Sequence, residues 1–140
     1  MRKQITIPFL KVDKMVPLVR FSYKGEVYCG IVDTGADVTI FGDAIQNDNP
    51  SNGQEINLVA FSGEKTSAAK ETTVDLDFFT MRGKTAPIKI TGIHSDLSIL
   101  QNHLQKNGIN LSLQLIIGSD MLHKYQADIN FEYTKMIVLQ

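Results

Sequence analysis

Apolar and polar residues alternate in short stretches along most of this chain, which is the pattern of β-strands that bury one face. An alternating stretch at residues 16–23 runs into Lys24 and Gly25, and residues 26–32 form a second, mostly apolar stretch. Glycine accepts the positive φ that a tight turn requires. The pattern therefore predicts a β-hairpin made of these two segments.

A second hairpin is predicted over residues 55–70. Apolar residues enter it, and Ser62 and Gly63 lie near its tip. Its outgoing arm, residues 64–69, has few large apolar side chains. We therefore expect this arm to bury little apolar surface and to stand away from the core.

A third hairpin is predicted over residues 73–90, with its turn at Arg82 and Gly83. Alternate apolar residues on its first strand predict a buried face formed by Val74, Leu76 and Phe78. The chain closes with two more short apolar stretches, 127–131 and 136–139. The prevalence of such segments predicts an all-β fold.

Two helices are expected on this β scaffold. Ser95 is a suitable N-cap for a helix that ends near Asn107, and Gly108 is a suitable C-terminal stop. The helix near 95–107 resembles an insertion, and it is expected to pack on the sheet through Leu97, Leu100 and Leu104. A second, short helix on the C-terminal side is expected at residues 119–125.

The composition narrows the classes to which this protein can belong. Its 140 residues, 43% of them hydrophobic, suit a single domain, residues 1–140, with a substantial core. The net charge is −1 and no block is densely charged, so neither nucleic acid nor a membrane surface is an expected partner. The single cysteine, Cys29, allows no internal disulfide. We find neither a signal peptide nor a membrane-spanning apolar stretch, so a cytoplasmic location is expected.

Residues 31–40 are the most informative segment. An apolar strand leads into Asp33, a turn follows at Thr34 and Gly35, and a second apolar segment leaves. In a purely structural interpretation, Asp33 accepts hydrogen bonds from backbone amides in a turn between two strands. Taken alone, so short a motif does not establish a catalytic aspartate.

A second informative segment lies about 80 residues further along the chain. Residues 115–122 consist of an apolar strand, Gly118 and a short helical stretch. A strand-to-helix junction explains this pattern structurally. Glycine at the junction also permits another backbone to approach closely.

Together the two segments resemble the retroviral-type aspartic proteases, or retropepsins. The family's catalytic signature, Asp-Thr/Ser-Gly-Ala/Ser, is matched by residues 33–36. Its late signature, apolar-apolar-Gly-x-Asp/Asn-x-Leu, is matched by residues 116–122. The hairpin predicted at residues 55–70 lies where the family has its mobile flap. The resemblance extends over roughly residues 15–139, apart from the inserted helix.

The resemblance implies a closed, retropepsin-like β fold and an aspartic endopeptidase that uses no cofactor and no metal. Asp33 would be the catalytic carboxylate, Thr34 would brace the loop by a hydrogen bond across a dimer interface, and Gly35 would let the substrate backbone approach. The residues implied for substrate binding are Ala36, Asp37, Ala60, Phe61, Ser62 and Gly63.

The number of carboxylates predicts a homodimer. Hydrolysis of a peptide bond without a covalent intermediate needs one group to accept a proton from water and another to polarise the carbonyl. Two close carboxylates fill both roles, because only one of them ionises readily. The chain contains one Asp-Thr/Ser-Gly sequence, so a symmetric pair of chains is required. The expected partners are a peptide or protein substrate and a second copy, with residues 4–9 and 136–140 as candidates for a shared terminal sheet.

One position departs from the family in a way that affects the active-site loop. Ser119 stands where many retroviral members have an arginine that supports this loop and the dimer. The partner of Asp37 therefore stays open at this point. Lys14 and Arg20 are candidates by sequence proximity.

Other interpretations have weaker support. His94, His103 and His123 lack metal-ligand spacing and are expected on the surface. Cys29 is expected to be a small core residue, and no local motif supports a Cys–His nucleophile. The alternative function is a catalytically silent protease-like domain used for dimerisation or peptide binding. The intact residues 33–36 argue against it, because a silent domain has no chemical need for the acid.

Overall fold

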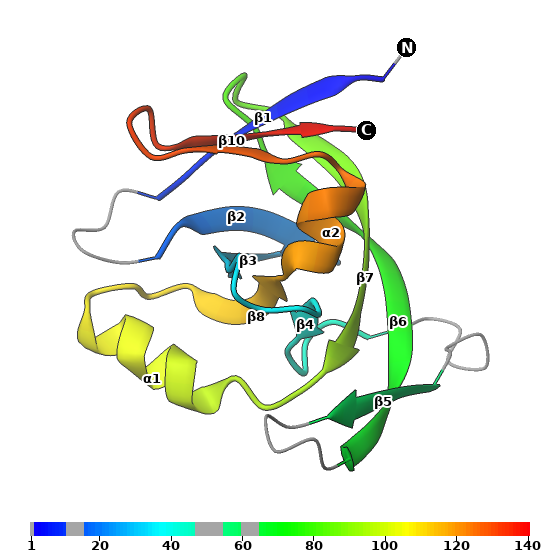
Figure 1. Ribbon diagram of the computed structural model, residues 1–140. Helices are drawn as coiled ribbons and strands as arrows, with labels where there is room; N and C mark the ends of the chain where they lie inside the picture. The colour runs from blue at the N-terminus through cyan, green and yellow to red at the C-terminus, as the bar shows by residue number, and fades with distance from the viewer. Residues whose placement is uncertain (1, 11–15, 47–54, 60–64) are drawn as a thin grey trace.

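The computed structural model describes residues 2–10, 16–46, 55–59 and 65–140, and only the backbone of residues 55–59 and 65–70. The described chain is mostly β-structure (Figure 1), which confirms the all-β expectation. None of the helices found in the described residues is long and apolar enough to cross a membrane.

The elements of the described residues are, in chain order, β1 (Gln4–Pro8), β2 (Leu18–Tyr23), β3 (Glu26–Val32), β4 (Ile40–Phe41), β5 (Glu55–Val59), β6 (Lys65–Phe79), β7 (Thr85–His94), α1 (Ser98–Lys106), β8 (Ser112–Ile117), α2 (Ser119–Lys124), β9 (Asp128–Asn130) and β10 (Lys135–Leu139).

The larger sheet contains seven of these strands, in the order β2-β3-β8-β4-β7-β6-β5. A further antiparallel pairing, with Phe21 opposite Phe78, joins β2 to β6 and so closes the first six strands into a ring. Within the ring, β3 runs parallel to β8, and β4 runs parallel to β7. The parallel pairing of β3 with β8 brings the carboxyl ends of both strands to the same edge.

Each of the three predicted hairpins has its two strands paired. Lys24 and Gly25, at φ 49° and 84°, form the two-residue turn between β2 and β3. Gly83, at φ 76°, lies in the turn between β6 and β7. β5 pairs antiparallel with the first residues of β6. The predicted tip of that hairpin, at Ser62 and Gly63, lies outside the described residues.

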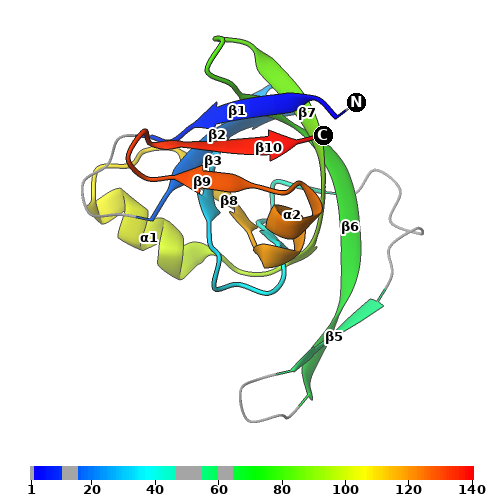
Figure 2. The ribbon, with the colours of Figure 1, turned by 45° about the horizontal axis from the view of Figure 1, so that its top comes forward.

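The smaller sheet joins the two ends of the chain in the order β1-β10-β9. β1 is antiparallel to β10, with Gln4 opposite Leu139 and Pro8 opposite Lys135. Figure 2 shows these strands side by side, with α2 next to β9. The two terminal segments therefore pair with each other inside one chain, and β1 and β9 form the edges of this sheet.

The main hydrophobic core contains Val74, Leu76 and Phe78, so the predicted buried face of the third hairpin is confirmed. A second cluster lies on the other face of β3 and β8, beneath α1. Its buried members are Leu18, Cys29, Ile31, Leu97, Leu104, Leu113 and Ile116. α1 thus covers an apolar surface that the ring alone would leave in water, and it makes β3 and β8 buried on both faces.

The start of α1 differs from the sequence expectation. Asp96 Oδ1 accepts a hydrogen bond from the backbone amide of Ser98 at 2.9 Å, and the helix begins at Ser98. The predicted cap at Ser95 is wrong, because the Asp96 carboxylate reaches the first helical amide instead. This hydrogen bond lowers the pKa of Asp96. Gly108, at φ 85°, follows the helix as its predicted stop.

The predicted apolar face of α1 is only partly correct. Leu97 and Leu104 are 8% and 1% exposed, whereas Leu100 is 39% exposed. Leu97 and Leu104 are one heptad apart and therefore point the same way from the helix axis. Leu100 lies to the side of that line and stays partly in water.

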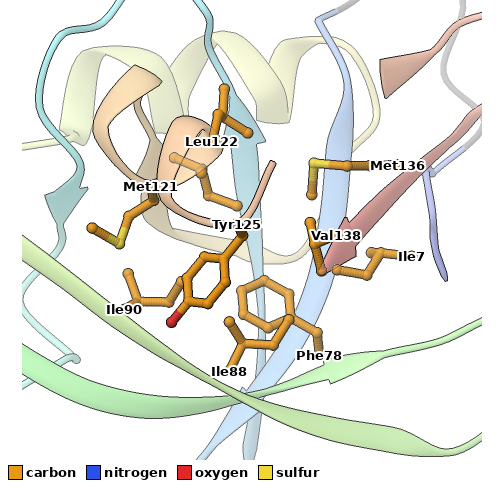
Figure 3. A pocket seen from close by; sticks show the side chains of 10 residues that line it. Ile7, Phe78, Ile88, Ile90, Met121, Leu122, Tyr125, Met136 and Val138 are labelled. Carbon is orange, nitrogen blue, oxygen red and sulfur yellow. The ribbon is translucent and has the colours of Figure 1, made fainter. Parts of the chain in front are cut away.

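Figure 3 shows a small apolar pocket in the main core, next to α2. The side chains that line it are Ile7, Phe78, Ile88, Ile90, Ile117, Met121, Leu122, Tyr125, Met136 and Val138. Tyr125 places its hydroxyl at the edge and donates a hydrogen bond to the Lys89 carbonyl. Desolvation, and then the negative charge of Asp75, raise the pKa of Tyr125, so the hydroxyl stays a donor. These contacts hold α2 against β7 and β10.

The burial of α1 can be tested with a matched pair of leucine substitutions. Leu104→Ala should lower the free energy of unfolding by about 2–5 kcal/mol, because it opens a cavity beneath the helix. Leu100→Ala removes the same atoms from a partly exposed site and should cost about 1 kcal/mol or less. Urea unfolding of both variants measures the difference. Equal losses would contradict the assigned face of the helix.

Candidate active site

Asp33 follows directly after β3, at the edge where β3 and β8 end together. The last residue pairs of these parallel strands are Ile31 with Ile116 and Val32 with Ile117. The ladder then continues through one more bond, in which the amide of Asp33 donates to the Ile117 carbonyl at 2.9 Å. The two signature segments, distant in sequence, are therefore in direct contact.

The loop after Asp33 is a tight turn that leaves the carboxylate accessible. The amide of Gly35 donates to Asp33 Oδ1 at 2.9 Å, and the amide of Ala36 donates to the Asp33 carbonyl at 3.2 Å. This geometry matches the structural interpretation of the motif. Asp33, Thr34 and Gly35 are nevertheless exposed, and no hydrogen bond within the described part of the chain reaches Asp33 Oδ2. One carboxylate oxygen is thus open to a water molecule or a second protein group.

Gly118 permits the close contact between the loop and the β8–α2 junction. A Cβ on Gly118 would lie 2.7 Å from the Val38 carbonyl and 2.8 Å from the Ala36 oxygen. The amide of Ser119 donates to that same Ala36 oxygen at 2.7 Å. Because neither clash involves a flexible side chain, any other residue at this position would push the Asp33 loop away.

Two polar side chains, Thr39 and Asp120, hold the far end of the loop. Thr39 Oγ1 donates to Asp120 Oδ1 at 2.7 Å, and the Thr39 amide donates to Oδ2 at 3.2 Å. Thr39 Oγ1 also accepts a hydrogen bond from the Gly118 amide at 3.0 Å. Thr39 is buried, so these partners replace the water that it loses on folding. Sequence reasoning assigned neither residue a role, although both lie within the two signature segments.

Gly92 on β7 supports the same residue from the other side. The amide of Ile93 donates to the Thr39 carbonyl at 3.0 Å, and a Cβ on Gly92 would lie 2.6 Å from that oxygen. Sequence reasoning missed Gly92 as well. A glycine inside a strand indicates that another segment approaches closely, but the sequence does not identify that segment.

The residues implied for substrate binding fall into two groups. Ala36 is half-buried and Asp37 is exposed, and both belong to the Asp33 loop. The other four, Ala60, Phe61, Ser62 and Gly63, lie outside the described residues. In Figures 1 and 2, β5 and the first part of β6 extend away from the rest of the molecule. The expectation that this arm stands away from the core is met for its backbone.

A shallow hollow borders Thr34 on the side of α2 and β9. Its lining residues are Thr34, Ser119, Leu122, His123, Gln126, Ala127 and Ile129. β9 forms the open edge of the smaller sheet at this point. The exposed loop threonine and an unpaired strand edge are therefore neighbours.

Of the two candidate partners of Asp37, only Arg20 is described, and its side chain packs elsewhere. The Arg20 guanidinium carbon lies 4.8 Å from the centre of the Phe79 ring, in a cation–π contact. Lys14 lies outside the described residues. Asp37 thus faces solvent, and no ion pair of it is found within the described part of the chain.

The histidines and the cysteine occupy the positions expected of them. His94, His103 and His123 are all exposed. Cys29 is fully buried, and burial raises the pKa of its thiol to about 11. A thiol that stays protonated at neutral pH is a poor nucleophile, which disfavours a cysteine-based mechanism.

The chain matches no protein-family model and no curated protein sequence. The function of the Asp33 loop is therefore inferred from its own residues and geometry.

The support that Asp120 gives to the loop can be measured. Asp120→Ala leaves the amide and hydroxyl of Thr39 without their acceptor, so the free energy of unfolding should fall by about 1–3 kcal/mol. Asp120→Asn keeps one carbonyl oxygen at this position and should cost less. Asp43→Ala, which removes an exposed carboxylate elsewhere, is the matched control. A loss no larger for Asp120→Ala than for Asp43→Ala, in chemical unfolding, would contradict the assignment.

Proposed function

We propose that this protein is an aspartic endopeptidase of the retropepsin type, with a closed retropepsin-like fold, and that it acts as a homodimer. The observation that supports this best is the position of Asp33. Its carboxylate lies exposed on a loop that is held between β8, α2 and β7 by backbone contacts and by Thr39 and Asp120. A rigid loop that presents an open carboxylate is what general acid–base catalysis requires.

The chemistry needs two such carboxylates. An ionised Asp33 would accept a proton from a water molecule whose oxygen attacks the peptide carbonyl. The protonated Asp33 of the second subunit would donate to the carbonyl oxygen, which yields a tetrahedral diol. The first Asp33 would then return its proton to the amide nitrogen, and the ionised Asp33 of the second subunit would take a proton from a diol hydroxyl. The C–N bond would break, which leaves a carboxylic acid, a free amine and the dyad in its starting state. Two carboxylates close together share one proton in this way because both cannot ionise cheaply.

A second copy of the chain would bind beside Thr34. The hollow formed by Thr34, α2 and β9 is continuous with the Asp33 loop, and it contains the apolar side chains of Leu122, Ala127 and Ile129. β1 and β10 are already paired with each other. The open edge of β9 is therefore the part of the smaller sheet nearest to Thr34 that is able to pair with another chain.

Substrate would bind as an extended peptide across the two Asp33 loops. Asp37, exposed on the same loop, would accept hydrogen bonds from the main chain of the peptide. The β5–β6 hairpin would supply the covering element, with Ala60, Phe61, Ser62 and Gly63 nearest to the peptide. A cover of this kind excludes water and strengthens the electrostatic interactions inside the site.

Cleavage of a peptide library tests the endopeptidase proposal against the catalytically silent alternative. Asp33→Asn should abolish cleavage and leave the unfolding transition and the dimer almost unchanged, because the two side chains are nearly the same size. Asp43→Asn, at an exposed carboxylate away from the loop, should keep full activity. Cleavage that persists in pure Asp33→Asn protein would rule out the assigned acid. Absence of any cleavage by the wild-type dimer would favour the silent domain.

Dilution tests the requirement for two chains. Specific activity should fall once the concentration drops below the dissociation constant of the dimer, by mass action. Thr34→Ala should weaken the dimer by about 1–3 kcal/mol, because it leaves groups at the interface without hydrogen-bond partners. Ile129→Lys should also weaken it, because it places a charge at the strand edge. Sedimentation alongside the activity assay measures both effects, and full specific activity from a demonstrated monomer would defeat the proposal.

A further inference from the structure

A groove lies between β1 and the turn that connects β6 to β7, away from the Asp33 loop. In Figure 2 this turn and β1 lie together at one end of the molecule, and the amide of Met81 donates to the Thr6 carbonyl at 3.0 Å. The residues that line the groove are Lys3, Gln4, Ile5, Thr6, Thr80, Met81, Arg82, Lys84, Thr85, Ala86 and Lys135.

The groove concentrates positive charge in a protein whose net charge is −1. Lys3, Arg82, Lys84 and Lys135 line it, and its lining contains no acidic residue. No salt bridge of these four side chains is found within the described ranges; Lys135 Nζ lies 5.6 Å from the centre of the Tyr133 ring. These cations come from the residue before β1, from the β6–β7 turn and from β10, so their convergence is a property of the fold. Such a site favours an anionic ligand.

The edge of β1 adds a second recognition element. Lys3 and Gln140 exchange two backbone hydrogen bonds, at 2.9 and 2.8 Å. Because bonded residues alternate along an antiparallel strand, the backbone groups of Gln4 and Thr6 face the outer edge of β1, toward the groove. The Thr6 carbonyl is taken by Met81, whereas no described backbone group pairs with the Gln4 or Thr6 amide. An extended peptide is able to pair with such an edge.

The β6–β7 turn holds its cations on a fixed backbone. The amide and hydroxyl of Thr80 donate to the Lys84 carbonyl at 2.9 and 2.7 Å, and the Gly83 amide donates to the Thr80 carbonyl at 3.1 Å. Gly83 adopts a φ of 76° that other residues rarely take. The backbone positions of Arg82 and Lys84 relative to β1 are therefore set before any ligand binds, which lowers the entropic cost of ordering the turn.

We propose that this groove binds an acidic peptide segment, which lies extended along the edge of β1 with its carboxylates toward Lys3, Arg82, Lys84 and Lys135. The site is separate from Asp33 and does not depend on proteolytic activity. A peptide fits better than a nucleic acid, because a strand edge matches a peptide backbone and the lining offers no aromatic side chain on which a base could stack.

Fluorescence anisotropy with defined probes tests this site in the full chain carrying Asp33→Asn, so that no probe is cleaved. A labelled peptide of alternating Glu and Thr should bind at low salt and be released as the ionic strength rises. A Gln–Thr peptide lacks the charge, and a Glu–Pro peptide lacks every second amide and favours a polyproline II helix over a strand, so both should bind more weakly. Arg82→Ala and Lys84→Ala should each weaken binding of the Glu–Thr peptide by about two- to five-fold, as expected for exposed charge pairs.

Lys106→Ala, at an exposed lysine on α1, is the matched control and should leave the affinity unchanged. On binding, the Gln4 and Thr6 amides should become protected from hydrogen exchange. The proposal would be overturned if the Gln–Thr peptide bound as tightly as the Glu–Thr peptide, or if the Glu–Thr peptide did not bind at low salt. It would also be overturned if Lys106→Ala weakened binding as much as Arg82→Ala and Lys84→Ala do. If a thymidine oligonucleotide bound more tightly than the Glu–Thr peptide, the ligand class would be nucleic acid and the peptide proposal would be wrong. Equal binding of the Glu–Pro peptide would overturn the strand pairing along β1.

Discussion

The contact between the loop after β3 and the turn before α2 is the constraint on which the candidate active site depends. Two parallel strands end side by side, and the backbone of each then passes within hydrogen-bond distance of the other. Only glycine fits at residue 118, since any side chain would meet the backbone of the Asp33 loop. The rest of the loop's support, from Thr39, Asp120 and Gly92, surrounds this one contact.

This constraint also explains why β3 and β8 must be rigid. Both strands are buried on two faces, by the main core on one side and by α1 on the other. Leu97 and Leu104 bring α1 onto the outer face, so this helix stabilises the pair of strands that positions Asp33. Support from both faces limits how far the strand ends, and with them the Asp33 loop, can be displaced.

The positive charge of the groove beside β1 is arranged independently of the contacts that hold the Asp33 loop. The Asp33 loop is held by backbone hydrogen bonds and by the contact of Thr39 with Asp120. Arg20, a candidate partner of Asp37, packs on Phe79 instead. The cations of the groove beside β1 come from segments far apart in the chain. A count of charges along the sequence shows no basic block, although the lining of this groove contains four cations and no acidic residue. The two regions can therefore be altered independently by mutation.

The amino-acid sequence by itself determined the strands and the hairpin turns, because alternation and positive-φ glycines are local properties. It also predicted the turn at Asp33 and the strand-to-helix junction at Gly118. Its local rules failed at the start of α1, where Asp96 and Ser95 are both suitable acceptors and the path of the chain decides between them. Only the tertiary structure paired Thr39 with Asp120 and closed the ring through β2 and β6. These contacts join residues that are distant in sequence, and their partners are selected by the packing of the whole sheet, which no local pattern encodes.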